Sequence, residues 1–251
     1  MNEPTRAHKT IVKPGTAAAG RAQFPALPQA RHWVLLGVLL CAAVIALGFT
    51  VRLLPGDTAA ELQVDQDLSQ HHVALLTAVA MGINFLFGPV AGLGLIAIIA
   101  IVVLLVRRDL ATAVAFGIVA CSGWVASEAF KLIVARQRPN PALLFDPLSP
   151  ETGSNSFPSG HASFAVALAF ALYFLSRGTR WSKLVAVAGA VMAVIVAWSR
   201  LYVGVHYPTD VTASFLAASA AFVLLAGLWN RYAPRLFDRL PAALSARPAR
   251  R

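Results

Sequence analysis

Long apolar runs alternate with short polar stretches along this chain. A helix needs about 20 apolar residues to cross the hydrocarbon core of a bilayer. Six runs reach or approach that length, at residues 33–54, 90–106, 110–135, 160–176, 183–199 and 209–229. The pattern predicts an all-α, multi-pass membrane protein built as a bundle of six transmembrane helices. A further apolar stretch at 73–87, broken from the second span by Gly88-Pro89, predicts a short interfacial helix, with a seventh span as the alternative.

A polar segment follows the first span. Thr58 and Glu61 have the spacing of a capping box, which predicts a short acidic helix on the extracytoplasmic side. We expect its carboxylates, Asp65 among them, to face solvent. His71 and His72 are adjacent, and adjacent helical residues point in different directions, so this pair does not predict a metal site.

The distribution of positive charge predicts how the chain lies in the membrane. Only 13% of residues are charged, against about a quarter in soluble domains, and the net charge is +10. The termini and the turns near residues 108 and 180 hold 16 of the 21 Lys and Arg residues. Because basic residues favour the cytoplasmic side, both termini are predicted to be cytoplasmic, in a plasma membrane. This asymmetry argues against nucleic acid as a partner. The excess of Arg over Lys is typical of a GC-rich bacterial source.

One membrane domain is predicted, with a tail on each side. Residues 1–31 lack periodicity and predict a disordered cytoplasmic tail, residues 32–230 form the six-span domain, and residues 231–251 form a basic tail suited to anionic lipid headgroups. Cys41 and Cys121 both lie in the middle of spans, which favours small buried side chains over a disulfide or a metal site.

Three polar motifs stand where apolar runs end or begin, and ionisable groups at a membrane edge indicate a functional site. The first is Lys131 with Arg138-Pro139. Lys131 and Arg138 share a face if the helix continues that far, and Pro139 predicts that it ends near Arg138. Arginine suits a bidentate grip on phosphate oxygens, and lysine adds a point charge. The alternative is that both side chains only extend to the lipid headgroups.

The second motif, Pro158-Ser159-Gly160-His161, opens the fourth span. Proline is favoured in the first turn of a helix, so the N–H groups of Ser159, Gly160 and His161 are predicted to be free. A helix N-terminus with free N–H groups binds phosphate readily, and Gly160 would let the ligand approach the backbone. A simple helix cap is the alternative.

The third motif joins the fifth and sixth spans. Ser199 and Arg200 end one span, and His206 and Asp210 stand four residues apart at the start of the next. Asp210 can accept the imidazole N–H of His206, as the aspartate of a serine triad does. The alternative is a surface histidine paired with a helix-capping aspartate.

Taken together, Lys-x6-Arg-Pro, Pro-Ser-Gly-His and Ser-Arg-x5-His-x3-Asp resemble the motifs of the type 2 phosphatidic acid phosphatase superfamily. The resemblance covers about residues 33–229 and implies a phosphohistidine mechanism with no metal or other cofactor. It implies that His206 is the nucleophile, that Asp210 activates it, and that His161 protonates the departing lipid oxygen. It assigns the phosphoryl oxygens to Lys131, Arg138, Arg200, Ser159 and Gly160. Because the two imidazoles need opposite protonation states, activity is expected to peak in pH.

The sequence therefore predicts a lipid phosphatase whose site faces the extracytoplasmic side. The expected substrate is a polyprenyl (undecaprenyl) diphosphate, followed by phosphatidylglycerophosphate or phosphatidic acid. A phosphotransferase that passes the phosphate to another acceptor is one alternative, and a lipid-binding or transport protein without catalysis is another. A haloperoxidase is disfavoured because those relatives are soluble. Nothing in the sequence indicates the oligomeric state.

Overall fold

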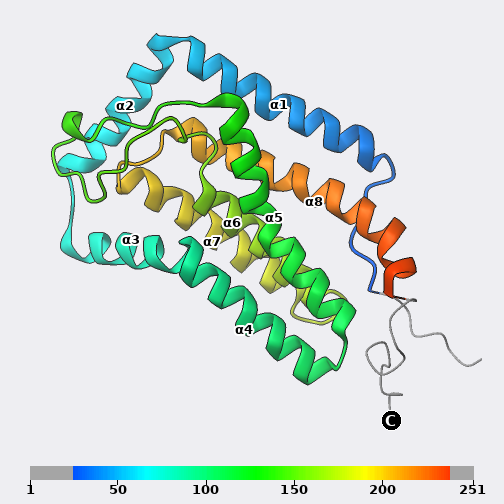
Figure 1. Cartoon of the computed structure of the whole chain (residues 1–251). Helices are drawn as coiled ribbons and strands as arrows, with labels where there is room; N and C mark the ends of the chain where they lie inside the picture. Colours follow the sequence, from blue (N-terminus) through cyan, green and yellow to red (C-terminus); the bar gives the residue numbers. More distant parts are fainter. Residues whose placement is uncertain (1–24, 238–251) are drawn as a thin grey trace, which may run out of the picture.

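The computed structural model describes residues 25–237, and this range contains helices and loops without a strand (Figure 1). The predicted all-α class is confirmed for this part of the chain. The elements are α1 (Trp33–Leu53), α2 (Pro55–Gln70), α3 (Ala74–Leu86), α4 (Pro89–Arg107), α5 (Leu110–Val134), the 3-10 turn η1 (Pro141–Leu143), α6 (Gly160–Ser176), α7 (Ser182–Tyr202) and α8 (Pro208–Phe237).

Five of the described helices are long and apolar enough to cross a membrane, namely α1, α4, α5, α7 and α8. α6 is also apolar but has 17 residues, or about 26 Å of helix against a hydrocarbon core of about 30 Å. α3 is shorter still, with 13 residues. The multi-pass membrane architecture is therefore confirmed, whereas the sixth crossing and the interfacial position of α3 stay predictions.

α6 lies at the centre of the bundle and packs against α5, α7 and α8, while α1 lies along α8 (Figure 1). Its residues from Ala162 to Leu168 are buried. The rings of Trp124 on α5 and Phe164 on α6 stack with their centroids 3.9 Å apart. Gly123 makes this approach possible, because a Cβ at this position would collide with the backbone of Ser163. The close packing of α5 and α6 brings the end of one helix beside the start of the other.

One end of the bundle collects all three polar motifs. α5 and α7 end there and α6 and α8 begin there, and α2, α3 and the loop between α5 and α6 lie at the same end (Figure 1). Two hydrogen bonds tie this loop to α2: Gln66 Nε2 donates to the Leu143 carbonyl (2.9 Å), and the Phe145 N–H donates to Ser69 Oγ (3.1 Å). α2 therefore forms part of the wall around the motifs.

Two helix boundaries differ from expectation. α5 ends at Val134 rather than near Arg138, because Ala135 adopts a left-handed conformation (φ 50°) that stops the helix. Arg138 consequently lies in the loop and not on a helical face shared with Lys131. α8 continues to Phe237, beyond the predicted end of the last span.

The prediction that the acidic helix faces solvent is wrong for two residues of α2. Asp65 has no exposed surface, and Glu61 forms an ion pair with the buried Arg136. A helix packed by one face against the bundle buries the residues of that face, and Glu61 and Asp65 are one turn apart on it.

Residues 25–31, part of the predicted N-terminal tail, pack against the far end of α8. The Leu27 backbone N–H donates to Asn230 Oδ1 (2.8 Å), and Asn230 Nδ2 donates to the Leu27 carbonyl (2.9 Å). Trp229 Nε1 donates to the Pro25 carbonyl (3.0 Å). The remaining predicted tail segments, 1–24 and 238–251, lie outside the described residues. Cys41 and Cys121 are free thiols.

Candidate functional site

The structure brings the predicted residues together at one end of the bundle. We call them the motif cluster: Lys131, Arg138, Ser159, Gly160, His161, Arg200, His206 and Asp210. His161 lies in the first turn of α6, Arg200 lies in the last turn of α7, and His206 precedes α8. His161 and Arg200 both bond to Asn84, and Arg138 Nη1 lies 3.5 Å from His206 Nε2. Segments far apart in the sequence thus converge on the two imidazoles.

His206 is buried, and its two ring nitrogens face different partners. Nδ1 lies 3.6 Å from Asp210 Oδ2, an ion-pair distance slightly longer than a hydrogen bond. Nε2 lies 3.5 Å from Nη1 of Arg138. Because a guanidinium only donates, this geometry favours a tautomer with the proton on Nδ1 and a free lone pair on Nε2. Burial lowers the pKa of His206 to about 4; Asp210 opposes this shift, and Arg138 and Arg200 add to it.

Asp210 is completely buried, and both of its carboxylate oxygens have donors. Oδ1 accepts from Arg136 Nη1 (2.7 Å). Oδ2 accepts from Ser156 Oγ (2.5 Å) and from the Tyr207 N–H (2.9 Å). These bonds hold the carboxylate in one orientation, with Oδ2 turned toward His206.

Asn84, on α3, links His161 to Arg200. The Asn84 carbonyl accepts from His161 Nε2 (3.1 Å), and its side-chain Oδ1 accepts from Arg200 Nη1 (2.7 Å). A carbonyl can only accept, so Nε2 of His161 carries a proton. The predicted interfacial helix therefore contributes directly to the geometry of the cluster.

Besides His206, whose Nδ1 lies 3.6 Å from Asp210, two members of the cluster present buried donors without a hydrogen-bond partner. Arg200 and Ser159 have no exposed surface, and within residues 25–237 no acceptor meets Arg200 Nε, Arg200 Nη2 or Ser159 Oγ. Buried donors are normally satisfied, and several orphaned donors beside imidazoles suit an anion with several oxygens. One prediction is wrong: the Ser159 N–H is not free, because it donates to the Asp210 carbonyl (3.3 Å). Ser159 is the N-cap, and α6 begins at Gly160.

The other two cations have carboxylate partners. Lys131 Nζ donates to the exposed Glu128 (2.7 Å). Arg138 pairs with Glu151 (2.9 Å) and donates to Asn155 Oδ1 (2.7 Å) and to the Val205 carbonyl (3.0 Å). Burial lowers the pKa of Arg138, although an arginine remains charged near neutral pH. These contacts fix the side chains without neutralising the whole cluster.

Gly160 lies where α5 comes closest to the start of α6. A Cβ at this position would lie 3.4 Å from Ser127 Oγ and 3.5 Å from Lys131 Nζ. The missing side chain leaves space between the start of α6 and the lysine. The approach of a ligand to the backbone there stays a prediction.

Sequence reasoning missed four residues that shape the site: Asn84, Ser156, Arg136 and Glu61. Only Arg136 had a usable signal, since it is a third cation beside Lys131 and Arg138. Among the described residues no three His, Cys, Asp or Glu side chains are grouped to hold a metal ion. His72, excluded as a ligand, contacts Asp146 (2.9 Å) and the Tyr202 carbonyl (2.9 Å).

Residues 108–234, just over half of the 251-residue chain, match the family model of the PAP2 superfamily. This chain belongs to that superfamily. The PAP2 match contains all three motifs and therefore the whole motif cluster. It extends from the turn before α5 almost to the end of α8.

Individual PAP2 relatives support the same assignment. The undecaprenyl-diphosphatase of Sulfolobus acidocaldarius is 38% identical over 99 residues, 38% of this chain and 44% of the relative. Phosphatidylglycerophosphatase B of Bacillus subtilis is 36% identical over 106 residues, 40% of this chain and 50% of the relative. The chain spans no more than half the length of these curated relatives. A crystal structure of a transmembrane PAP2 type phosphatidylglycerolphosphate phosphatase from Bacillus subtilis matches with a TM-score of 0.67 and 27% identity. That match covers 78% of this chain and 96% of the other.

Proposed function

We propose that this protein is a membrane phosphatase that hydrolyses the terminal phosphate of a lipid, through a phosphohistidine intermediate. The observation that carries the proposal is that His161 meets Arg200 through Asn84 and His206 meets Arg138, beside the unpartnered donors of Arg200. Fixed positive charge and two imidazoles suit a reaction in which one ring, neutral, attacks and the other, protonated, gives up a proton. The named activities of the PAP2 relatives support a lipid phosphatase in general.

The proposed reaction has two steps. Nε2 of His206 attacks phosphorus as the bond to the leaving oxygen breaks, and His161, protonated on both ring nitrogens, gives one proton to that oxygen and becomes neutral. Water then attacks the phosphohistidine, His161 takes a proton from the water, and inorganic phosphate leaves as the bond to Nε2 breaks. Asp210 stabilises the positive charge that develops on His206, as in a serine triad. The phosphoryl oxygens bind the cations of the cluster, Ser159 Oγ and the Gly160 N–H, which stabilise the transition state.

Six membrane crossings suit this function, and contacts between the first and last described segments support that number. Leu27 and Asn230 are hydrogen-bonded, so the chain enters α1 and leaves α8 on the same side, which requires an even number of crossings. α6 is the natural sixth, because Arg107, at the end of α4, donates to the Leu175 carbonyl near the end of α6 (2.7 Å). We infer that the termini are cytoplasmic and that the cluster faces the extracytoplasmic side of the plasma membrane.

The substrate follows from this position. A site at headgroup depth lets lipid chains remain in hydrocarbon while the phosphate reaches the cations. A polyprenyl diphosphate is our first choice, with phosphatidylglycerophosphate and phosphatidic acid next. The relatives include an undecaprenyl-diphosphatase and a phosphatidylglycerophosphatase, which supports the first two candidates without ranking them.

Release of inorganic phosphate by the purified protein in detergent tests the proposal. The panel contains a prenyl diphosphate, phosphatidylglycerophosphate and phosphatidic acid, each with and without a chelator. We expect activity that survives chelation and that falls at least about 10³-fold in His206→Ala. His71→Ala is the matched control, since His71 is exposed and lies outside the cluster. Loss of activity with chelator would refute the metal-free mechanism, and full activity in His206→Ala would refute the assigned nucleophile. A labelled second lipid in place of free phosphate would indicate phosphotransfer.

A further inference from the structure

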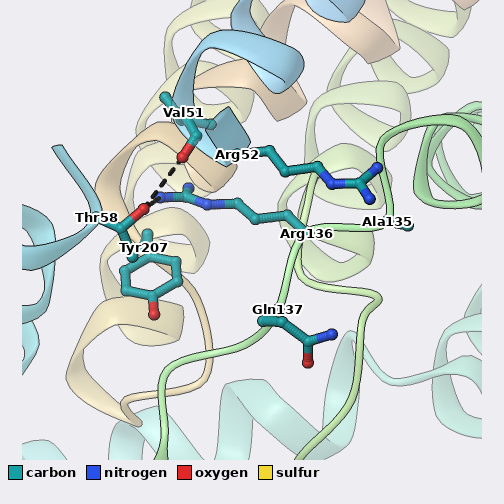
Figure 2. Close-up of a pocket in the computed structure, with 7 residues that line it drawn as sticks. All are labelled: Val51, Arg52, Thr58, Ala135, Arg136, Gln137 and Tyr207. Atoms are coloured by element: carbon teal, nitrogen blue, oxygen red, sulfur yellow. Dashed lines mark hydrogen bonds between the residues drawn. The ribbon is translucent and has the colours of Figure 1, made fainter. Parts of the chain in front are cut away.

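Arg136 occupies the centre of a buried ionic network that the three motifs do not include. Its Nη1 donates to Asp210 Oδ1 (2.7 Å) and to Thr209 Oγ1 (2.7 Å), and its Nη2 donates to Glu61 Oε2 (2.6 Å). Only 3% of the Arg136 side chain is exposed. The guanidinium also lies over the Tyr207 ring, 4.2 Å from its centroid (Figure 2). It is thus fixed from three sides.

Glu61 completes the network from α2. Besides Arg136, its carboxylate accepts from the Thr209 backbone N–H (2.8 Å) and from Thr209 Oγ1 (3.0 Å). These bonds cap the first turn of α8, which carries Asp210 one residue later. The same carboxylate therefore holds both the arginine and the helix that presents Asp210.

We propose that Arg136 and Glu61 are positioning residues for the His206–Asp210 pair, which makes α2 a working part of the site. Among the described residues, Arg136 is the one arginine or lysine bonded to the Asp210 carboxylate. It holds Oδ1, which leaves Oδ2 to face His206. It also keeps Asp210 ionised, since a neighbouring guanidinium stabilises the charged form of a carboxyl group. Neither residue touches substrate, and the inference rests on the proposed phosphatase function.

The charges around this pair set the sign of the expected effects. The groups that interact electrostatically with His206 are Asp210, Arg138, Arg200 and His161. Those that interact with Arg136 are Asp210, Glu61 and Asp65. Burial acts to lower the pKa of Arg136, but Asp210 and Glu61 outweigh it and raise that pKa. Loss of the Arg136 charge should strengthen the attraction between Asp210 and a protonated His206. Loss of the Glu61 charge should weaken that attraction.

A cavity beside Arg136 permits a chemical test. It has a volume of about 390 Å³ and is lined by Val51, Arg52, Thr58, Ala135, Arg136, Gln137 and Tyr207 (Figure 2). Free guanidinium is small enough to enter this space and take the place of a deleted arginine side chain. Arg52 supplies the matched control, because it lines the same cavity but donates to the Val134 carbonyl (2.7 Å) and not to Asp210.

The experiment measures phosphate release from the substrate that wild-type protein hydrolyses best, over a range of pH. Arg136→Ala should lower kcat about 10- to 100-fold with little change in KM, a loss of the size seen when a group that orients a metal-binding side chain is removed. Millimolar guanidinium chloride should restore much of this loss, and potassium chloride should not. Arg52→Ala should retain wild-type kcat with or without guanidinium.

The pH profiles separate a positioning role from a merely structural one. The acid limb of kcat/KM should move to higher pH in Arg136→Ala and to lower pH in Glu61→Gln. If Arg136→Ala does not fold, Glu61→Gln decides alone, since glutamine can still accept from the Thr209 N–H. Wild-type kcat in Arg136→Ala, loss without guanidinium rescue, or an unmoved acid limb in either variant would overturn the inference. Absence of phosphate release from wild-type protein, or full activity in His206→Ala, would instead overturn the proposed function.

Discussion

Asp65 should make the protein less stable as the pH rises. Its side chain has no exposed surface, and within the described residues neither carboxylate oxygen has a hydrogen-bond partner. Burial raises the pKa of Asp65 from 3.8 to about 8; Asp210 and Glu61 add to this shift, and Arg136 opposes it. The folded protein therefore keeps a proton on Asp65 over a range in which the unfolded chain has lost it.

The size of the effect follows from linkage between protonation and folding. Between about pH 4 and pH 8 the folded state binds one proton more than the unfolded state at this residue, so unfolding free energy falls by about 1.4 kcal/mol per pH unit. The contribution is fully present below about pH 4 and is lost as pH rises through the folded pKa of about 8. From pH 5 to pH 7 the predicted loss from Asp65 alone is about 2–3 kcal/mol.

Denaturant unfolding in detergent at pH 5, 6 and 7 tests this prediction by comparison of slopes. Asp65→Asn removes the titrating group, so its stability should depend less on pH than that of wild type by about 1.4 kcal/mol per unit. Any fixed cost of the buried amide is the same at each pH and cancels from the slope. Asp67→Asn, on the same helix but exposed, should follow wild type. Equal slopes in wild type and Asp65→Asn would show that Asp65 is ionised or hydrated in the folded protein.

Three further predictions concern the site, and phosphate release measures each. The pKa of His206 is lowered to about 4, and its neutral ring must attack. After correction for the ionisation of the lipid phosphate, kcat/KM should therefore fall only below about pH 4–5. An acid limb at pH 6.5 would contradict the buried, unprotonated ring. Asn84→Asp should raise KM about 10-fold, because a carboxylate beside Arg200 would neutralise the cation that we expect to bind phosphate. An unchanged KM would exclude Arg200 from phosphate binding. Gly160→Ala should fold with almost wild-type stability, because its Cβ would meet Lys131 Nζ at an ordinary contact distance of 3.5 Å. The variant should nevertheless bind phosphate several-fold more weakly. Unchanged inhibition by inorganic phosphate would count against binding of phosphate to the backbone there.

The helices and the meeting of the motifs were predictable because their signals are local. Apolar runs mark the spans, and Gly88-Pro89 separates α3 from α4 as expected. The three motifs each adjoin a span end, so antiparallel packing alone brings them to one face. Where α5 ends was less predictable, because Ala135 stops the helix in a left-handed conformation that non-glycine residues seldom adopt, and no sequence signal marks it.

The residues that surround the motif cluster could not be predicted, and the reason is different. Glu61 and Asp65 look like ordinary solvated acids until α2 is placed against the start of α8. Asn84 has no pattern of its own, and its importance comes from packing that puts its carbonyl near His161 and its amide near Arg200. Such contacts arise between elements distant in sequence, and a single sequence carries no direct record of them.

The two hydrogen bonds between Leu27 and Asn230, which we call the clasp, limit how the chain can be truncated and tagged. A shortened gene that starts at Trp33 would keep every apolar run but would discard the backbone groups that satisfy the Asn230 amide and the Trp229 indole. The apolar side chain of Leu27, buried to 97%, would leave an uncovered hollow at the foot of the last helix. Affinity handles and fluorescent fusions are therefore best joined upstream of Pro25, where they leave this clasp in place.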